Sequence, residues 1–312
     1  MILSRSKRFL GVGATFFAAL AIGGYWYVFI DGTPQFDGPD ATAAEQSTGL
    51  TYTIQTFNSH AMGMLRRYGV LLPPGYSEHS SQRYPVIFLL HGGHGDATDW
   101  FQKAAAVSVI QSLYDSDRLP PSIIITPDGN DKRGSSALWD PQYIDGKHGR
   151  VMSMIGAELV NEVRRRYRTK TQPQFWAIGG LSSGGWGAIN IGLHYPQTFG
   201  VLFSHSGYFI DRGSPLNSPM TYVVTMNPVE RDRLRVYLDA GRGDRRFLNQ
   251  SLKFHQRLDR LGVPNVFREF PGGHGIYGAE VGWNYWHRHL ADSLAYVGDH
   301  FKAADSSQRA AK

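Results

Sequence analysis

Apolar runs that end in glycine alternate along the chain with segments of helical spacing. The runs PVIFLLHGG, SIIITPDGN and QFWAIGG are continuous in apolar residues before the glycine, as expected of buried strands. Further strands are predicted at TYTIQTF, RRYGVLL, VLFSHSGYF, RVYLDAG and NVFREFPGG. Helical spacing marks SMIGAELVNEVRRRY, WGAINIGLHY, SLKFHQRLDRLG and WNYWHRHLADSLAYVGDHF. Buried strands that alternate with helices predict an α/β fold, in which helices cover both faces of a mostly parallel central sheet.

The N-terminal segment has a different pattern. FLGVGATFFAALAIGGYWYVFI, residues 9–30, carries no charge and follows the basic SRSKR. A helix of about 20 apolar residues crosses a bilayer, so this run is long enough to do so. Tyr25, Trp26 and Tyr27 suit a membrane interface, and the nearest A-x-A, Ala41–Ala43, lies far beyond the run. We therefore predict an uncleaved transmembrane anchor, with a cleaved signal peptide and a secreted protein as the alternative.

The sequence also predicts the membrane topology and the domain organisation of the chain. Basic residues before the apolar run place that end in the cytoplasm and the remainder outside it, in the periplasm or extracellular space. The expected parts are an anchor or signal segment at residues 1–30, a polar linker at 31–49, one α/β domain at 50–302 and a polar tail at 303–312. The chain has no cysteine, which excludes disulfides, thiolate metal ligands and thiol catalysis. Its net charge of +6 is mild and scattered, and it predicts no nucleic-acid site.

One glycine cluster lies where a predicted strand meets a predicted helix. Gly180-Leu181-Ser182-Ser183-Gly184 fits G-x-S-x-G. In this context the pattern indicates a nucleophile elbow, a sharp turn that exposes a serine hydroxyl at the edge of the sheet. Ser183 is the alternative nucleophile, but it lacks a glycine two residues before it. We therefore predict that Ser182 is the nucleophile, against the plainer interpretation of a tight turn or helix cap.

A serine nucleophile needs a base, and an acid to orient that base, on loops that follow later strands. Among the twelve histidines, His274 lies in a glycine-rich loop, FPGGHGIYG, directly after a late strand. His205 ends the strand after the elbow helix, which is too early for the base. Asp239 and Asp244 both lie in YLDAGRGD and are the candidate acids. Asp244 is preferred because its loop position is better placed to reach a neighbouring loop.

The tetrahedral intermediate of acyl transfer needs backbone N–H donors for its oxyanion. The amide after the nucleophile, that of Ser183, is the first expected donor. The loop His91-Gly92-Gly93-His94-Gly95 follows a buried strand, and we choose Gly93 as the second donor. The two histidines of this loop are expected to shape it through local hydrogen bonds. No third metal ligand accompanies them, and neither a metal nor a cofactor is implied.

From about residue 52 to residue 301 the chain resembles the esterase D / antigen 85 group of α/β-hydrolases. The resemblance is carried, in order, by VLLPPGYSEHSSQRYPVIFLLHGG, ITPDG, ELVNEVRRRYRT, GGLSSGGWGA, YPQTFGVLFSHSG, LDAGRGD and FPGGH. It implies the α/β-hydrolase fold, with Ser182 as nucleophile, Asp244 as acid and His274 as base. It also implies the oxyanion amides of Gly93 and Ser183. Many members have methionine where this chain has Ser183, which leaves the required N–H in place.

The group includes feruloyl and acetyl-xylan esterases, S-formylglutathione hydrolases, enterochelin esterases and mycolyltransferases. The resemblance implies a serine carboxylic-ester hydrolase that works through an acyl-enzyme. The predicted location favours acylated sugars or polysaccharides and argues against S-formylglutathione, a cytosolic substrate. An acyltransferase that delivers the acyl group to a sugar hydroxyl shares every step up to the acyl-enzyme. A non-catalytic binding protein is a third hypothesis, which the complete set of site residues disfavours.

Four aromatic residues are expected on or near loops at the active edge of the sheet: Trp100, Trp139, Trp186 and Tyr277. Aromatic faces stack on sugar rings, and aromatic side chains also line acyl pockets. Packing in the core accounts for each of the four equally well. The expected partners are a small-molecule or glycan ester and, through the N-terminal helix, a membrane.

Overall fold

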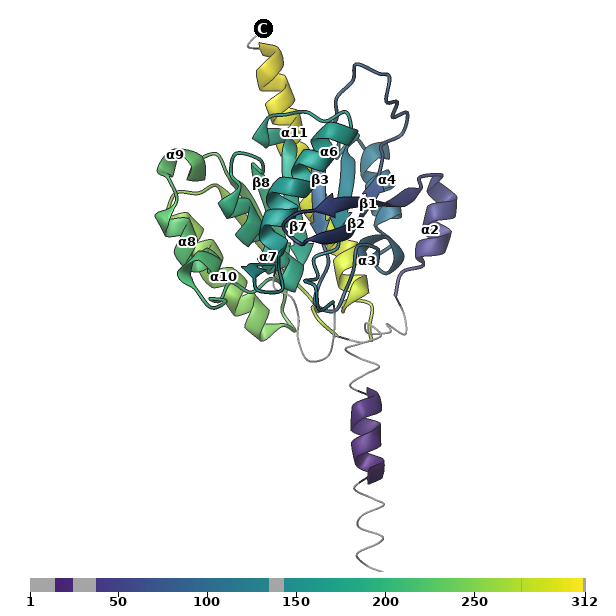
Figure 1. Cartoon of the computed structure of the whole chain (residues 1–312), viewed down its shortest axis with the longest axis vertical. Helices are drawn as coiled ribbons and strands as arrows, with labels where there is room; N and C mark the ends of the chain where they lie inside the picture. Colours follow the sequence, from purple (N-terminus) through teal and green to yellow (C-terminus); the bar gives the residue numbers. More distant parts are fainter. Residues whose placement is uncertain (1–14, 25–37, 135–142, 276, 311–312) are drawn as a thin grey trace, which may run out of the picture.

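The structure, a computed structural model, describes residues 15–24, 38–134, 143–275 and 277–310 (Figure 1). An eight-stranded sheet crosses the middle of the molecule in the order β1-β2-β4-β3-β7-β8-β9-β10. Its strands are β1 (Tyr52–Ser59), β2 (Met64–Leu71), β3 (Val86–Leu90), β4 (Ile123–Pro127), β7 (Trp176–Leu181), β8 (Val201–His205), β9 (Arg235–Gly241) and β10 (Asn265–Phe270). The β1–β2 and β2–β4 pairs are antiparallel, and the other pairs are parallel. The predicted mostly parallel sheet is confirmed.

Helices cover both faces of this sheet, as predicted. In the view of Figure 1, α6 (Val160–Arg166) and α7 (Ser183–His194) lie in front of it, and α11 (Trp283–Ala310) lies behind. The remaining helices are α2 (Ala41–Thr48), α3 (Asp99–Gln102), α4 (Ala106–Asp115), α5 (Val151–Ser153), α8 (Pro219–Thr225), α9 (Pro228–Arg231) and α10 (Arg245–Arg260). A short hairpin, whose strands β5 (Asp145–Gly146) and β6 (Gly149–Arg150) have two residues each, precedes α5. A π-helical turn, Met154–Leu159, joins α5 to α6.

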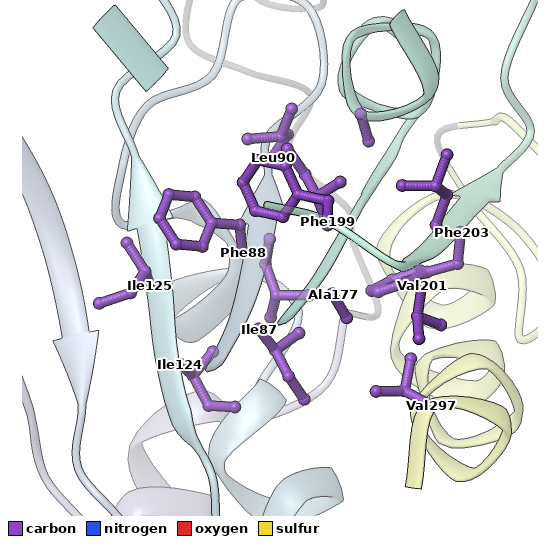
Figure 2. Packing of buried hydrophobic residues seen from close by; sticks show 14 of the residues in the cluster. Ile87, Phe88, Leu90, Ile124, Ile125, Ala177, Phe199, Val201, Phe203 and Val297 are labelled. Atoms are coloured by element: carbon purple, nitrogen blue, oxygen red, sulfur yellow. The ribbon is translucent and has the colours of Figure 1, made fainter. Parts of the chain in front are cut away.

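The central strands are apolar throughout because both of their faces are covered. Every residue of β3, β4 and β7 is buried. Figure 2 shows how their side chains meet those of β8 and α11: Ile87, Phe88 and Leu90, Ile124 and Ile125, Ala177, Val201 and Phe203, and Val297. This packing fixes the carboxyl ends of β3, β7, β8, β9 and β10 along one edge, where the loops that carry the predicted site begin.

The N-terminal and C-terminal segments differ from expectation in detail. Residues 15–24 are helical, and the described residues include no helix long and apolar enough to cross a membrane. The other residues of the predicted span 9–30 lie outside the described part of the chain. Part of the predicted linker forms α2, and α11 continues to Ala310, through most of the predicted polar tail. Helix α11 continues because Ala304 packs against the core and Asp305 pairs with Lys170 and Arg309.

Candidate active site

Ser182 lies in the turn between the last residue of β7 and the first residue of α7. Its backbone angles are φ 52° and ψ −119°, a conformation that residues with a side chain rarely adopt. The backbone N–H of Ser182 donates to the carbonyl oxygen of His205 on β8, at 2.9 Å. Ser182 is half-buried, whereas the following Ser183 is buried inside α7. The turn therefore exposes Ser182, the predicted nucleophile, and not the alternative.

The glycines around Ser182 are required by close backbone contacts. A Cβ atom on Gly184 would lie 2.2 Å from the carbonyl oxygen of His91. One on Gly180 would lie 2.6 Å from the backbone of Gly184. Heavy atoms do not approach so closely without a backbone shift. At Gly180 and Gly184 there is thus room only for the hydrogen atom of a glycine and not for a side chain. This requirement explains the glycine cluster in the sequence.

The structure pairs His274 with Asp244. The Oδ2 atom of Asp244 lies 2.6 Å from Nδ1 of the His274 ring and accepts the backbone N–H of His274 at 2.7 Å. The carboxylate is nearly buried, and Gly273, with φ 128°, lets the loop run against it, since a Cβ there would lie 2.5 Å from the carboxyl group. A carboxylate at Nδ1 holds the ring proton on that nitrogen and leaves Nε2 as the acceptor, which is the tautomer that a general base needs.

The Nε2 atom of His274 is buried and has no hydrogen-bond partner among the described residues. Ser182 and His274 are thus not hydrogen-bonded to each other in this structure. They lie on the same edge of the sheet, one after β7 and the other after β10. The hydrogen bond between a nucleophile and its base is often long or absent before the substrate binds. A His274 Nε2 atom without a hydrogen-bond partner is therefore compatible with a role as general base.

Two aromatic side chains fix the plane of the His274 ring. Phe247 stacks on it with ring centroids 4.2 Å apart, and Trp286 meets it edge-on at 5.2 Å. Phe247 lies in the first turn of α10, directly after the loop of Asp244, and Trp286 lies in the first turn of α11. Neither residue belongs to a motif that the sequence pattern indicates. Their only sequence signal is an aromatic residue in the first turn of the helix that follows a site loop.

Asp239, the alternative acid, contacts different residues. It is fully buried, and its Oδ2 atom lies 2.6 Å from Nδ1 of His205. Its Oδ1 atom accepts the hydroxyl of Tyr285 at 2.9 Å. The structure therefore brings Asp244, and not Asp239, to His274.

The predicted oxyanion loop runs beside Ser182. A Cβ on Gly92 would lie 3.7 Å from the Cβ of Ser182 and 2.6 Å from Cδ1 of Leu181. The His91 ring shapes the loop as expected, because Nδ1 bonds the carbonyl oxygen of Gly92 at 2.7 Å and Nε2 accepts the N–H of Gly129 at 2.9 Å. Gly93, the chosen donor, follows directly and is half-buried.

Side chains from other elements hold the carbonyl groups of this loop. Trp100 Nε1 donates to Leu90 at 3.0 Å, Tyr143 Oη to His91 at 2.7 Å and Asn130 Nδ2 to Gly95 at 2.9 Å. A backbone whose carbonyl groups are fixed in this way cannot easily rotate its peptide planes. Fixed peptide planes are what an oxyanion hole requires, since its donors must point at the developing charge before the reaction begins.

A buried carboxylate supports the same loop from below. Asp99 is the first residue of α3, and a Cβ on Gly95 would lie 2.3 Å from its Oδ2 atom. Burial raises the pKa of Asp99, while Lys103, at 3.0 Å, opposes this shift. Asp99 is enclosed between the loop and Lys103, so we assign its carboxylate a structural role in supporting the loop.

The four aromatic candidates have different surroundings. Trp100 and Trp186 are buried in the core, and Trp186 Nε1 donates to the carbonyl oxygen of Ile210 at 3.2 Å. This is the core-packing alternative that the sequence left open for them. Tyr277, in the loop of His274, is 69% exposed. Trp139 lies outside the described residues. In the part of the chain that the structure describes, no group of three or more His, Asp or Glu side chains is arranged to hold a metal.

The chain is similar in sequence to known esterases. Residues 59–297 match the model of the family described as "Putative esterase". An esterase of Mycobacterium tuberculosis is 26% identical over 257 residues, which cover 70% of this chain and 54% of that protein. An acetyl esterase of Caldicellulosiruptor saccharolyticus is 25% identical, with 70% of this chain and 84% of that protein covered. The chain spans about half or less of the length of the first curated relatives it matches.

A solved structure of a ferulic acid esterase extends the comparison to the fold. It superposes with a TM-score of 0.69 at 25% sequence identity, over 80% of this chain and 99% of the other. The elbow at Ser182 and the Asp244–His274 pair lie within the matched family region. The chain belongs to the esterase family of α/β-hydrolases.

Proposed function

We propose that the protein is a serine carboxylic-ester hydrolase in which Ser182, His274 and Asp244 form the catalytic triad. The observation that carries this proposal is the strained turn at Ser182, on the same edge of the sheet as the Asp244–His274 pair. A serine is a weak nucleophile by itself and needs such a base. Sequence relatives named esterase and acetyl esterase support ester hydrolysis as the reaction.

The proposed reaction proceeds through an acyl-enzyme. Nε2 of His274 takes the proton of the Ser182 hydroxyl as Oγ attacks the ester carbonyl, and Asp244 stabilises the imidazolium that forms. The N–H groups of Gly93 and Ser183 stabilise the oxyanion. The alcohol leaves with the proton from His274. Water then attacks the acyl-enzyme through the same base, which releases the acid and restores Ser182.

The proposed substrates are acylated sugars or polysaccharides outside the cytoplasm, with water as the acceptor. One relative supports this class by its name, an endo-1,4-beta-xylanase/feruloyl esterase of Xylanibacter ruminicola. Hydrolysis needs no second binding site, whereas a transferase must hold an alcohol and limit the competition from water.

A fluorophosphonate probe tests the proposal directly. The probe is expected to form one covalent adduct, on Ser182, because the Oγ atom at the elbow is the activated hydroxyl. Peptide mapping by mass spectrometry identifies the labelled residue, and Ser182→Ala is expected to abolish the adduct. Ser183→Ala is the matched control and should label like the wild type, since only its backbone N–H takes part. A label on Ser183, or none on folded wild-type protein, would overturn the proposed triad.

We further propose that residues 9–30 anchor the protein in a membrane with the catalytic domain outside the cytoplasm. The support is the uncharged run, its interfacial aromatic residues and its basic flank. The full chain is expected to stay in the membrane fraction after high-salt and carbonate washes. Protease added from outside should digest the domain in intact cells stripped of any outer membrane. A soluble mature protein that begins near residue 44 would show cleavage of a signal peptide instead.

A further inference from the structure

A second Asp–His–Ser arrangement lies beneath the active edge, and none of its members takes part in the proposed chemistry. Nδ1 of His205 lies 2.6 Å from Oδ2 of Asp239, and Nε2 lies 2.9 Å from Oγ of Ser293 on α11. All three side chains are 0% exposed. The Ser293 hydroxyl also donates to the carbonyl oxygen of Leu290, one turn earlier in α11. Such burial excludes access by a substrate, so this Asp239–His205–Ser293 network has another role.

The network holds the nucleophile turn through the backbone of His205. The carbonyl oxygen of His205 accepts the N–H of Ser182 at 2.9 Å. In the sheet, His205 pairs with Leu181 of β7 on one side and with Asp239 of β9 on the other. The hydrogen-bonded ring of His205 therefore fixes the carbonyl group that restrains Ser182.

The same network reaches the His274 side of the site. Asp239 accepts the hydroxyl of Tyr285 at 2.9 Å, and the next residue, Trp286, meets the His274 ring edge-on. Burial and the neighbouring Asp239 charge raise the pKa of Tyr285, which keeps its hydroxyl protonated as a donor. Strand β9, which carries Asp239, leads directly into the loop of Asp244. The network is thus bonded to the turn of Ser182, to the strand that leads into the loop of Asp244 and to the helix whose Trp286 contacts the His274 ring.

We propose that Asp239, His205 and Ser293 are positioning residues that set the distance and angle between Ser182 and His274. This inference rests on Ser182 being the nucleophile. A buried polar network in which each group has a partner is rigid, because its bonds strengthen one another in a low-dielectric interior. Small errors in the alignment of reacting groups slow a reaction strongly, so rigidity at this point acts on the rate.

The test compares two fully buried serines, Ser293 of the network on α11 and Ser122 just before β4. Ser293→Ala removes the hydroxyl that holds Nε2 of His205. Ser122→Ala is the matched control, since Ser122 is 0% exposed, immediately precedes β4 and donates to the carbonyl oxygen of Pro120 at 2.7 Å. The measurements, on the full chain, are the rate constant for fluorophosphonate labelling, kcat and KM for p-nitrophenyl acetate, and Tm.

Ser293→Ala is expected to lower the labelling rate constant and kcat about 10-fold each, because the elbow loses alignment. KM should change less than about 2-fold, since substrate contacts are untouched. Ser293→Thr, which restores the hydroxyl, should recover most of the labelling rate. Ser122→Ala should label at the wild-type rate even where its Tm falls equally.

Three results would overturn the inference. The first is wild-type labelling of Ser293→Ala, which would show that the network supports stability alone. The second is equally slow labelling of Ser122→Ala, which would show a general loosening of the fold. The third is a wild-type protein that does not label at all, which would remove the proposed nucleophile together with the positioning role. The first two results leave the proposed function intact, so the two failures are distinguishable.

Discussion

An Asp244→Asn variant is expected to lose about 10⁴-fold in kcat while its fold stays intact. One carboxylate oxygen of Asp244 accepts both the ring and the backbone N–H of His274. An amide of the same shape presents an N–H₂ group that favours the other histidine tautomer, with the proton on Nε2. The base nitrogen is then blocked. Steady-state kinetics with a p-nitrophenyl ester measure the loss, and circular dichroism checks the fold.

The matched control is Asp239→Asn, at the other aspartate of YLDAGRGD. Asp239 is bonded to His205 and Tyr285 in the core, so this variant should lose more stability and only about 10-fold in kcat. Thermal unfolding and kcat, measured on both variants, separate the two roles. The reverse pattern, with Asp239→Asn inactive and Asp244→Asn merely unstable, would show that the acid is assigned to the wrong residue.

Gly184→Ala is expected to destabilise the protein by about 3 kcal/mol and to abolish labelling of Ser182. The added Cβ would lie 2.2 Å from the His91 carbonyl oxygen and 2.5 Å from that of Leu90. Both are backbone atoms of the neighbouring strand and loop, so neither can rotate away as a side chain would. The turn itself must shift. Tm should fall by roughly 6–12 °C, as expected for such a loss in a domain of this size.

Gly146→Ala provides the control for this substitution. Gly146 lies in the β5–β6 hairpin, and a Cβ there would meet no atom within 4 Å. The same added methyl group should therefore leave Tm and labelling near wild-type values. A Gly184→Ala variant as stable and as reactive as Gly146→Ala would contradict the requirement for glycine at the elbow.

The fold and the elbow were predictable because their signals are local. A strand buried on both faces needs a continuous apolar run, and a turn with no room for a side chain needs glycine, so both are visible in consecutive residues. The choice of Asp244 over Asp239 also followed from local position, since one aspartate lies in the strand and the other in the loop beyond it. In the structure Asp244, and not Asp239, contacts His274.

The remaining features depend on contacts between distant segments. His205 and Ser293 are 88 residues apart, and no sequence pattern joins them. The sequence does not tell which of the aromatic candidates are exposed and which are buried. Trp100 and Trp186 are buried because other helices and loops cover the segments in which they lie. Helix α11 continues through most of the predicted polar tail because Lys170, far away in sequence, pairs with Asp305. Pairing across such distances is decided by the tertiary fold.

The backbone of Ser182 also has a cost in stability. A residue with a side chain at such angles costs stability, typically about 1–3 kcal/mol, and glycine adopts them more easily. In a protein that only bound its ligand, glycine at this position would avoid the backbone strain without loss of function. Ser182 occupies it nevertheless, beside glycines that already take up the steric demands of the turn. The proposed role of Ser182 as nucleophile accounts for a serine hydroxyl at this costly position.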